Sequence, residues 1–157
     1  RQQAIWTMRQ ALSPAVSRLK PTKISEDATV PLGKIPAFLA DLEEIRQRLQ
    51  VDLVVFGHAG DGNFHPDLIC DERDEDEMRR VAQAVDEIFA SALRHGGTLS
   101  GEHGIGLLKL PYMTAAVDSP TLNAMRLLKR AFDPDNLLNP GKLLPDSAEA
   151  KEGVQPA

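Results

Sequence analysis

Residues 56–65 read FGHAGDGNFH, a glycine-rich segment that carries two histidines, an acid and an amide. The residues before it, 51–56 (VDLVVF), are mostly β-branched or aromatic, and residues 64–70 can form a second strand. An Asp-Gly pair between two such runs is typical of a hairpin turn. We therefore expect two antiparallel strands joined by a turn at Asp61 and Gly62.

The chemistry of this hairpin follows from its pairing. If Asp61 and Gly62 are the central residues of a type I′ turn, His58 lies directly opposite His65. Directly opposed residues project from the same face of a sheet, with Cβ atoms roughly 4.5–5.5 Å apart. Two imidazoles at that separation can bind one metal ion.

A second glycine-rich segment, GGTLSGEHGIG at residues 96–106, carries an acid next to a histidine. Glu102 offers an oxygen ligand, and His103 offers a base that titrates near neutrality. Together, His58, His65 and Glu102 supply two nitrogen ligands and one oxygen ligand, a set that leaves a position open for substrate. His103 then stays free as a general base. The alternative is that the two histidines cap strand ends and Glu102 binds backbone.

Amphipathic patterns flank the hairpin on both sides. Apolar residues recur at three- and four-residue spacing over residues 34–50, and again after the acidic segment 71–77, which predicts two helices. Residues 28–32 contain Pro31 and predict an edge strand. The order is β-α-β-β-α. We therefore expect an α+β fold, a ferredoxin-like antiparallel sheet with both helices on one face, plus a C-terminal helical segment.

The two ends of the chain carry simpler signals. Residues 1–12 predict a helix that the pair Ser13-Pro14 ends, and residues 17–27 predict a polar connector. Ser119-Pro120 predicts the start of another helix, with the serine as N-cap. Residues 146–157 are rich in Ala, Glu, Lys and Pro, which predicts a disordered tail.

Composition limits the class of protein. The chain has 157 residues, which suits one domain, and a net charge of −5 with no basic stripe, which argues against nucleic acid as a partner. The single cysteine, Cys70, cannot form an internal disulfide and suits a reducing compartment, so we expect a cytoplasmic protein. The sequence has no apolar run near the roughly 20 residues that span a bilayer.

Three motifs in order resemble the C-terminal domain of FAD-linked oxidases: GHAGDGNFH at 57–65, GTLSGEHGIG at 97–106 and DPDNLLNPGKLL at 133–144. This family contains the glycolate oxidase flavin subunit, D-lactate dehydrogenase and D-2-hydroxyglutarate dehydrogenase. The resemblance implies that residues 1–145 are the substrate-binding cap domain of a flavoprotein dehydrogenase, with FAD mainly on an N-terminal domain absent from this sequence. We expect the chain alone neither to hold FAD tightly nor to turn over.

The resemblance also implies roles for individual residues. It implies a divalent metal, zinc or manganese, at His58, His65 and Glu102, which binds the oxygens of a 2-hydroxy acid. His103 is similar to the base that takes the hydroxyl proton while hydride passes to the flavin. By the same resemblance Arg9 pairs with a substrate carboxylate, Asn63 contacts substrate, and Lys142 and Asn139 of the Asn-Pro-Gly-Lys segment lie toward the flavin.

Two other functions stay open. The domain could be a subunit-interaction module with a vestigial metal site, or a metal-dependent hydrolase, because two histidines and a carboxylate also form hydrolytic sites. Neither accounts for the segment at 139–142. The expected partners are a small 2-hydroxy acid and the chain's own FAD domain, with monomer and homo-oligomer both open. Residues 23–27 lack the tyrosine of some relatives, so the choice among lactate, glycolate and 2-hydroxyglutarate stays open.

Overall fold

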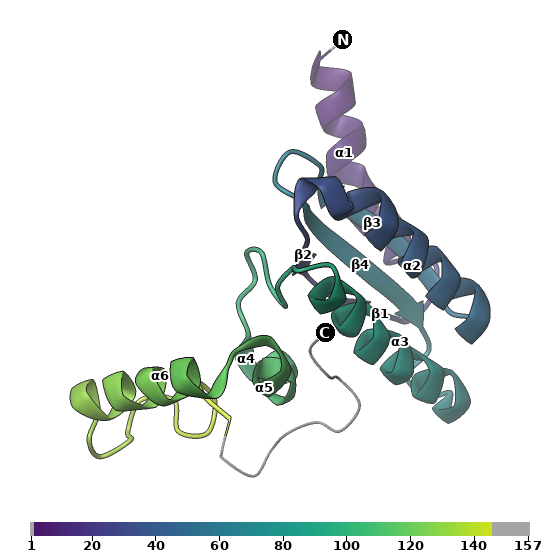
Figure 1. Ribbon diagram of the computed structural model, residues 1–157. Helices are drawn as coiled ribbons and strands as arrows, with labels where there is room; N and C mark the ends of the chain where they lie inside the picture. Colours follow the sequence, from purple (N-terminus) through teal and green to yellow (C-terminus); the bar gives the residue numbers. More distant parts are fainter. Residues whose placement is uncertain (1, 146–157) are drawn as a thin grey trace.

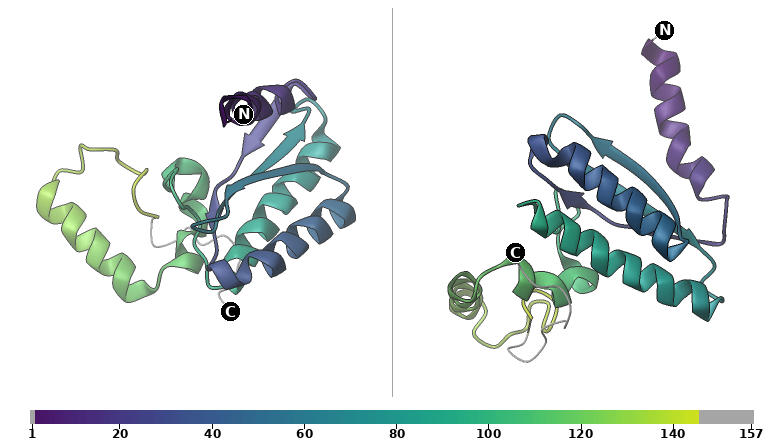
Figure 2. Two further views of the ribbon diagram at one scale, coloured as in Figure 1. Left: turned by 90° about the horizontal axis from the view of Figure 1, so that it is seen from above. Right: turned by 45° about the vertical axis from the view of Figure 1, so that its right-hand side comes forward.

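The computed structural model describes residues 2–145, so the disordered tail expected at residues 146–157 lies outside the described residues. Two long helices, α2 and α3, cover one face of an antiparallel sheet (Figure 1). Helices α1 and α6 project away from this two-layer body in different directions (Figure 2). The expected α+β fold, with both helices on one face of the sheet, is confirmed.

The elements follow the expected order. The strands are β1 (Thr22–Ser25), β2 (Ala28–Thr29), β3 (Asp52–His58) and β4 (Asn63–Cys70). The helices are α1 (Gln2–Val16), α2 (Ile35–Leu49), α3 (Glu75–Arg94), α4 (Gly106–Lys109), α5 (Met113–Ala116) and α6 (Ser119–Phe132), with 3-10 turns η1 (Leu32–Lys34) and η2 (Leu110–Tyr112).

Strand β4 is the centre of the sheet. It pairs with β3 on one side and with both β1 and β2 on the other, all antiparallel. β1 and β2 keep one register against β4, and the ladder is interrupted opposite Pro66, which has no N–H to donate. The edge strand expected at residues 28–32 is confined to β2. Thr98, just after α3, forms a single bridge with Thr29, at the position where a βαββαβ fold has its last strand.

The hairpin register differs from the expected one. His58 lies opposite Asn63, two positions from the expected partner His65. The connection is a loop at residues 59–62, whose last two backbone amides both donate to the carbonyl oxygen of His58. Gly62 takes the left-handed conformation, with φ of 77°, and closes this longer loop. Because the shift is two residues, His58 and His65 still project from the same face.

The first helix is longer than expected. α1 continues through Ser13-Pro14 to Val16, since a proline removes one helical hydrogen bond but the amide of Ser17 again donates to the carbonyl of Ser13 at 3.0 Å. α1 contributes no buried residue. Its apolar side chains stay in solvent, with Ile5 64% and Met8 70% exposed.

The polar connector expected at residues 17–27 contains strand β1 instead. Lys23 and Ser25 both donate hydrogen bonds to the carboxylate of Asp67 on β4, whereas Ile24 between them packs against the core. Polar and apolar side chains alternate along β1, as in a strand with one face in the core. Its polar residues have the composition of a loop, which is why the sequence predicts a connector here.

The N-cap expected at Ser119 is also wrong. Asp118 is the N-cap of α6, because its side chain accepts a hydrogen bond from the amide of Thr121 at 2.8 Å. Ser119 is therefore the first helical residue, and Asp and Ser serve equally well as caps.

The core lies between the sheet and the two long helices. Phe38 of α2, Leu68 of β4 and Ile88 of α3 have no exposed surface, and the lone thiol, Cys70, is buried with them. Among the described residues, no helix combines the length and the apolar character needed to cross a membrane.

A partly buried polar contact connects the two long helices. The carboxylate of Asp41 on α2 accepts hydrogen bonds from Ser91 and Arg94 of α3, and lies 3.0 Å from Nε2 of His95 at the end of that helix. Burial raises the pKa of Asp41, but the hydrogen bonds from Ser91, His95 and Arg94 lower it by a larger amount. The pKa of Asp41 is therefore below its ordinary value.

This depressed pKa predicts a pH-dependent effect of Asp41→Asn. A carboxylate whose pKa is lower in the folded state stabilises the fold above its unfolded pKa, about 3.9, and loses that contribution as the pH falls through its folded pKa. The free energy of unfolding lost in Asp41→Asn, measured with urea, should be largest near neutral pH and should shrink below about pH 4. A loss independent of pH would contradict the assignment.

Candidate functional site

The candidate site lies on the face of the sheet opposite α2 and α3. Alternate residues of β4 divide between the two faces, so Phe64 and Leu68 enter the core while His65 and Asp67 line a cavity on the other side. The alternation of side chains along β4 therefore separates an apolar face of the sheet from a polar one.

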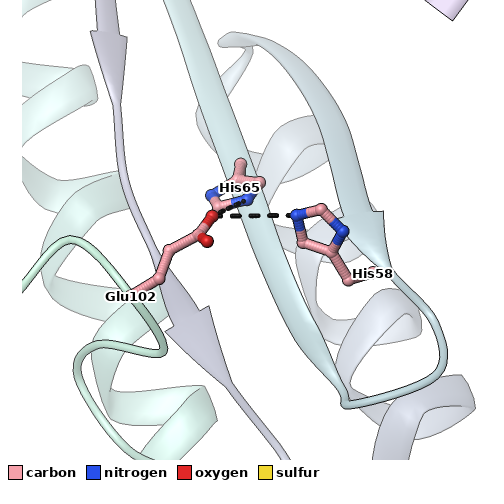
Figure 3. Close-up of side chains that lie close together, drawn as sticks. All are labelled: His58, His65 and Glu102. Atoms are coloured by element: carbon pink, nitrogen blue, oxygen red, sulfur yellow. Dashed lines mark ion pairs between the residues drawn. The ribbon is translucent and has the colours of Figure 1, made fainter.

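Three side chains, two from strands β3 and β4 and one from the loop after α3, meet on this open face (Figure 3). Nε2 of His65 lies 3.0 Å from Oε1 of Glu102, and Nε2 of His58 lies 3.7 Å from the same oxygen. One ligand atom from each of the three residues can be chosen so that all lie within 4.8 Å of one another. The diagonal pairing of the hairpin still brings the two imidazoles together, with ring centroids 5.5 Å apart.

His103 lies beside this cluster. Its ring stacks on that of His65 with centroids 5.0 Å apart and an interplanar angle of 16°. His103 and both hairpin histidines line one cavity of about 340 Å³, and Arg9 of α1 lines the same cavity. The structure thus brings together five of the residues singled out in the sequence.

Lys23, Ser25 and Asp67 also line this cavity. Asp67 is almost completely buried, and its carboxylate accepts hydrogen bonds from Lys23, at 2.9 Å, and from the hydroxyl of Ser25. The charge of Lys23 is therefore engaged by a protein carboxylate. This pair is not predictable from local sequence patterns, because it joins the expected connector to a strand more than forty residues away.

The loop that carries Glu102 and His103 approaches the sheet at Gly101. A Cβ at Gly101 would lie 2.3 Å from Oγ1 of Thr29 and 2.6 Å from Oδ1 of Asn63, so only glycine allows this approach. Asn63 is buried and accepts a hydrogen bond from Thr29 at 3.3 Å. Asn63 lines a small neighbouring cavity with Glu102 and does not line the cavity that holds Arg9 and His103.

A buried acid that sequence reasoning missed, Asp27, lies beneath the same loop. Its carboxylate has no exposed surface and accepts hydrogen bonds from the Ser100 hydroxyl and from the backbone amides of Gly101, Glu102 and His103. Burial by itself raises the pKa of Asp27, but these hydrogen bonds outweigh it and hold the pKa far below its usual range. The carboxylate is therefore ionised throughout the physiological pH range.

The C-terminal segment lies elsewhere. Asn139 takes the left-handed conformation, with φ of 51°, and its carbonyl accepts a hydrogen bond from the amide of Lys142 at 3.2 Å. Asn139 lines a cavity of about 370 Å³ with Arg126, Lys129 and Arg130 at the end of the molecule formed by α6. The structure does not bring Asn139 and Lys142 to the histidine cluster.

The fold and this site define an α+β domain in which three histidines and an arginine line one small cavity, with the carboxylate of Glu102 beside the histidines. The sequence profile of a protein family, the C-terminal domain of FAD linked oxidases, matches residues 1–143 of this chain. The chain belongs to that family, as its three motifs indicated.

Individual relatives agree with the family match. The chain is 48% identical over 143 residues to the glycolate oxidase subunit GlcD of Bacillus subtilis, covering 91% of this chain and 30% of that protein. It is 33% identical over 145 residues to D-2-hydroxyglutarate dehydrogenase of Stutzerimonas stutzeri, covering 90% and 31%. It is 35% identical over 139 residues to D-lactate dehydrogenase of Anaerostipes hadrus, covering 88% and 29%. The chain thus spans less than a third of the length of each of these relatives.

The close approach at Gly101 yields a prediction. Gly101→Ala should push the loop off Thr29 and Asn63, and should therefore separate the stacked rings of His65 and His103. The ring-proton chemical shifts of both histidines should change. Gly60→Ala is the matched control, because no atom lies within 4 Å of a Cβ there and its backbone is not left-handed. Ring shifts that stay unchanged in Gly101→Ala would show that the loop tolerates the added methyl group.

Proposed function

We propose that this chain is the substrate-binding domain of an FAD-dependent dehydrogenase or oxidase of 2-hydroxy acids, and that His58, His65 and Glu102 bind a divalent metal ion in it. The observation that carries the proposal is the meeting of these three ligand atoms at the wall of a cavity that also holds His103 and Arg9. Neither a hydrolase nor a subunit-interaction module accounts for the match to the FAD-linked oxidases.

The donor set fits a divalent ion. Two imidazole nitrogens and one carboxylate oxygen are ligands that suit zinc or manganese, and three protein ligands leave positions open for substrate. Nε2 of His58 and Nε2 of His65 both face Oε1 of Glu102, at 3.7 and 3.0 Å, so the three ligand atoms converge. Such an ion supplies Lewis-acid polarisation of a substrate oxygen, which makes a hydroxyl easier to deprotonate.

The residues around the cluster have separate tasks. Arg9 can bind a carboxylate through two parallel hydrogen bonds, which selects acids over plain alcohols. Lys23 is already paired with Asp67, so among the cations that line this cavity Arg9 is the one without a carboxylate partner among the described residues. The ring of His103 is half exposed, and Oε1 of Glu102 lies 3.9 Å from its Nε2. Among the described residues its imidazole makes no hydrogen bond, so it can accept the hydroxyl proton of the substrate.

The flavin would lie against a different part of the chain. Asn139 and Lys142 belong to a segment beside a cavity that Arg126 and Arg130 line, and cationic side chains suit the phosphate groups of a dinucleotide. These residues fit one edge of an FAD site, and FAD supplies the hydride acceptor. The names of the relatives, which include glycolate, D-lactate and D-2-hydroxyglutarate, support a small 2-hydroxy acid as the substrate.

The metal site predicts a selective effect of Mn²⁺ on the four histidines of the chain. In an NMR titration, paramagnetic broadening should erase the ring signals of His58, His65 and His103 first. The ring of His95, which pairs with Asp41 on the helix side of the sheet, should keep its signal and serves as an internal control. Calorimetry of the same titration should give saturable one-to-one binding.

Variants make this test sharper. His65→Ala and Glu102→Gln should each abolish saturable binding, because each removes a ligand, while His95→Gln should bind as the unaltered chain does. Equal broadening of all four rings, or binding that survives in Glu102→Gln, would count against the site.

The assignment of His103 predicts a kinetic effect. In the flavoprotein that contains this domain, His103→Gln should slow anaerobic reduction of the flavin by a 2-hydroxy acid by about 100-fold or more, because a general base contributes about 10²–10⁴-fold. The rate is read from the loss of visible flavin absorbance in a stopped-flow experiment, with His95→Gln as control. A rate within a few-fold of the unaltered protein would remove His103 from the mechanism.

A further inference from the structure

Asp27 occupies the interruption between β1 and β2, directly beneath the loop that carries Glu102 and His103. Its Oδ2 accepts four hydrogen bonds: from Ser100 Oγ at 2.6 Å and from the amides of Gly101, Glu102 and His103 at 3.1, 3.2 and 2.8 Å. Three consecutive amides thus converge on one carboxylate oxygen, which fixes the backbone of the loop.

The loop is also closed on itself. The hydroxyl of Ser100, which donates to Asp27, accepts a hydrogen bond from the amide of Gly104 at 2.7 Å. Both ends of the turn are therefore connected to the same buried carboxylate, directly or through Ser100. Because the direction of a side chain starts from its Cα–Cβ bond, the fixed backbone sets where the carboxylate of Glu102 and the imidazole of His103 can reach.

Lys109 holds Asp27 from the opposite side. Its ammonium group is buried and donates to the backbone carbonyls of Asp27, at 2.8 Å, and of Leu99, at 2.9 Å. The ammonium lies 3.8 Å from Oδ2 of Asp27, so it also compensates the buried negative charge. Lys109 thus ties the strand that carries Asp27 to the start of the loop.

We propose that Asp27 is the positioning residue of the site: its carboxylate places Glu102 as a metal ligand and His103 as a base by binding their backbone amides. This inference rests on the proposed function for the roles of Glu102 and His103. Asp27 touches neither the ligand atoms nor the cavity, and acts only through the loop.

The negative charge is the property that matters. An asparagine has the same shape, but a neutral amide oxygen accepts hydrogen bonds less strongly than a carboxylate oxygen, and its NH₂ group would face the Gly101 amide, donor against donor. Asp27→Asn would also remove the nearer of two carboxylates beside the buried ammonium of Lys109, since Oε2 of Glu26 lies 4.0 Å from it. The substitution therefore tests the contact with little change in packing.

In Asp27→Asn, the amides of Gly101, Glu102 and His103 should lose their protection against hydrogen exchange, and the stacked ring shifts of His65 and His103 should move. The affinity for Mn²⁺ should fall about 10- to 100-fold, the range seen when groups that orient metal ligands are removed. Asp133→Asn is the matched control, because Asp133 likewise binds two loop amides, those of Leu137 and Leu138, and a lysine, but far from the histidines. It should leave Mn²⁺ affinity and the exchange of residues 101–103 unchanged.

Protection across the sheet separates positioning from loss of stability. If Asp27 acts only through the loop, Asp27→Asn should leave the amides of β3 and β4 protected against hydrogen exchange, whereas a general destabilisation would speed their exchange as well. If Asp27→Asn does not fold, Ser100→Ala removes one donor only and should lower Mn²⁺ affinity about 2- to 10-fold while exposing the Gly104 amide to exchange.

The outcomes distinguish the two proposals. If the unaltered chain binds no Mn²⁺, the metal site fails, but the exchange rates and ring shifts still decide whether Asp27 places the loop. If the chain binds Mn²⁺ and Asp27→Asn retains that affinity, the loop protection and the ring shifts, the positioning role is overturned and the metal site stands.

Discussion

Strand β4 imposes the constraint on which the rest of the structure depends, because it pairs with every other strand and its side chains alternate between two faces. Phe64 and Leu68 join the core beneath α2 and α3, while His65 and Asp67 line the cavity on the opposite face. One strand therefore supplies both the apolar layer that stabilises the fold and the polar layer that carries the site. A shift of one residue would exchange the two layers.

This alternation explains why the sequence predicted the histidine pair in spite of an incorrect register. The expected two-residue turn placed His58 opposite His65, whereas the loop at residues 59–62 places it opposite Asn63. The error is an even number of residues, so both histidines keep the same face and become diagonal neighbours instead of direct ones. The faces of the strands were encoded in local periodicity, but the loop length depends on how Gly62 lies against the backbone of Val30, a contact that periodicity does not describe.

The parts of the site that the sequence did not reveal are long-range polar contacts. The sequence predicts a connector at Asp27, because an acid among polar residues has the pattern of a solvated loop. The four groups that donate hydrogen bonds to its carboxylate, however, lie more than seventy residues away in the chain. Lys109 was missed for the same reason. The helix α2, in contrast, was predictable, because its buried residues repeat at helical spacing within one segment. Local patterns determine elements, whereas the partners of a buried charge depend on the complete fold.

The two halves of the candidate site differ in how firmly the fold holds them. His58, His65 and Glu102 are attached to paired strands and to a loop bound by Asp27, so the half proposed to bind a metal ion is organised within this domain. Arg9 is carried by α1, which buries no residue and whose apolar side chains remain exposed, and such a helix takes little stability from tertiary packing. The arginine lines the same cavity as the histidines, but this domain alone does not fix it there. The proposed selection of a carboxylate by Arg9 therefore depends on a helix that this domain holds weakly, whereas the proposed metal ligands are placed by the sheet and by the loop on Asp27.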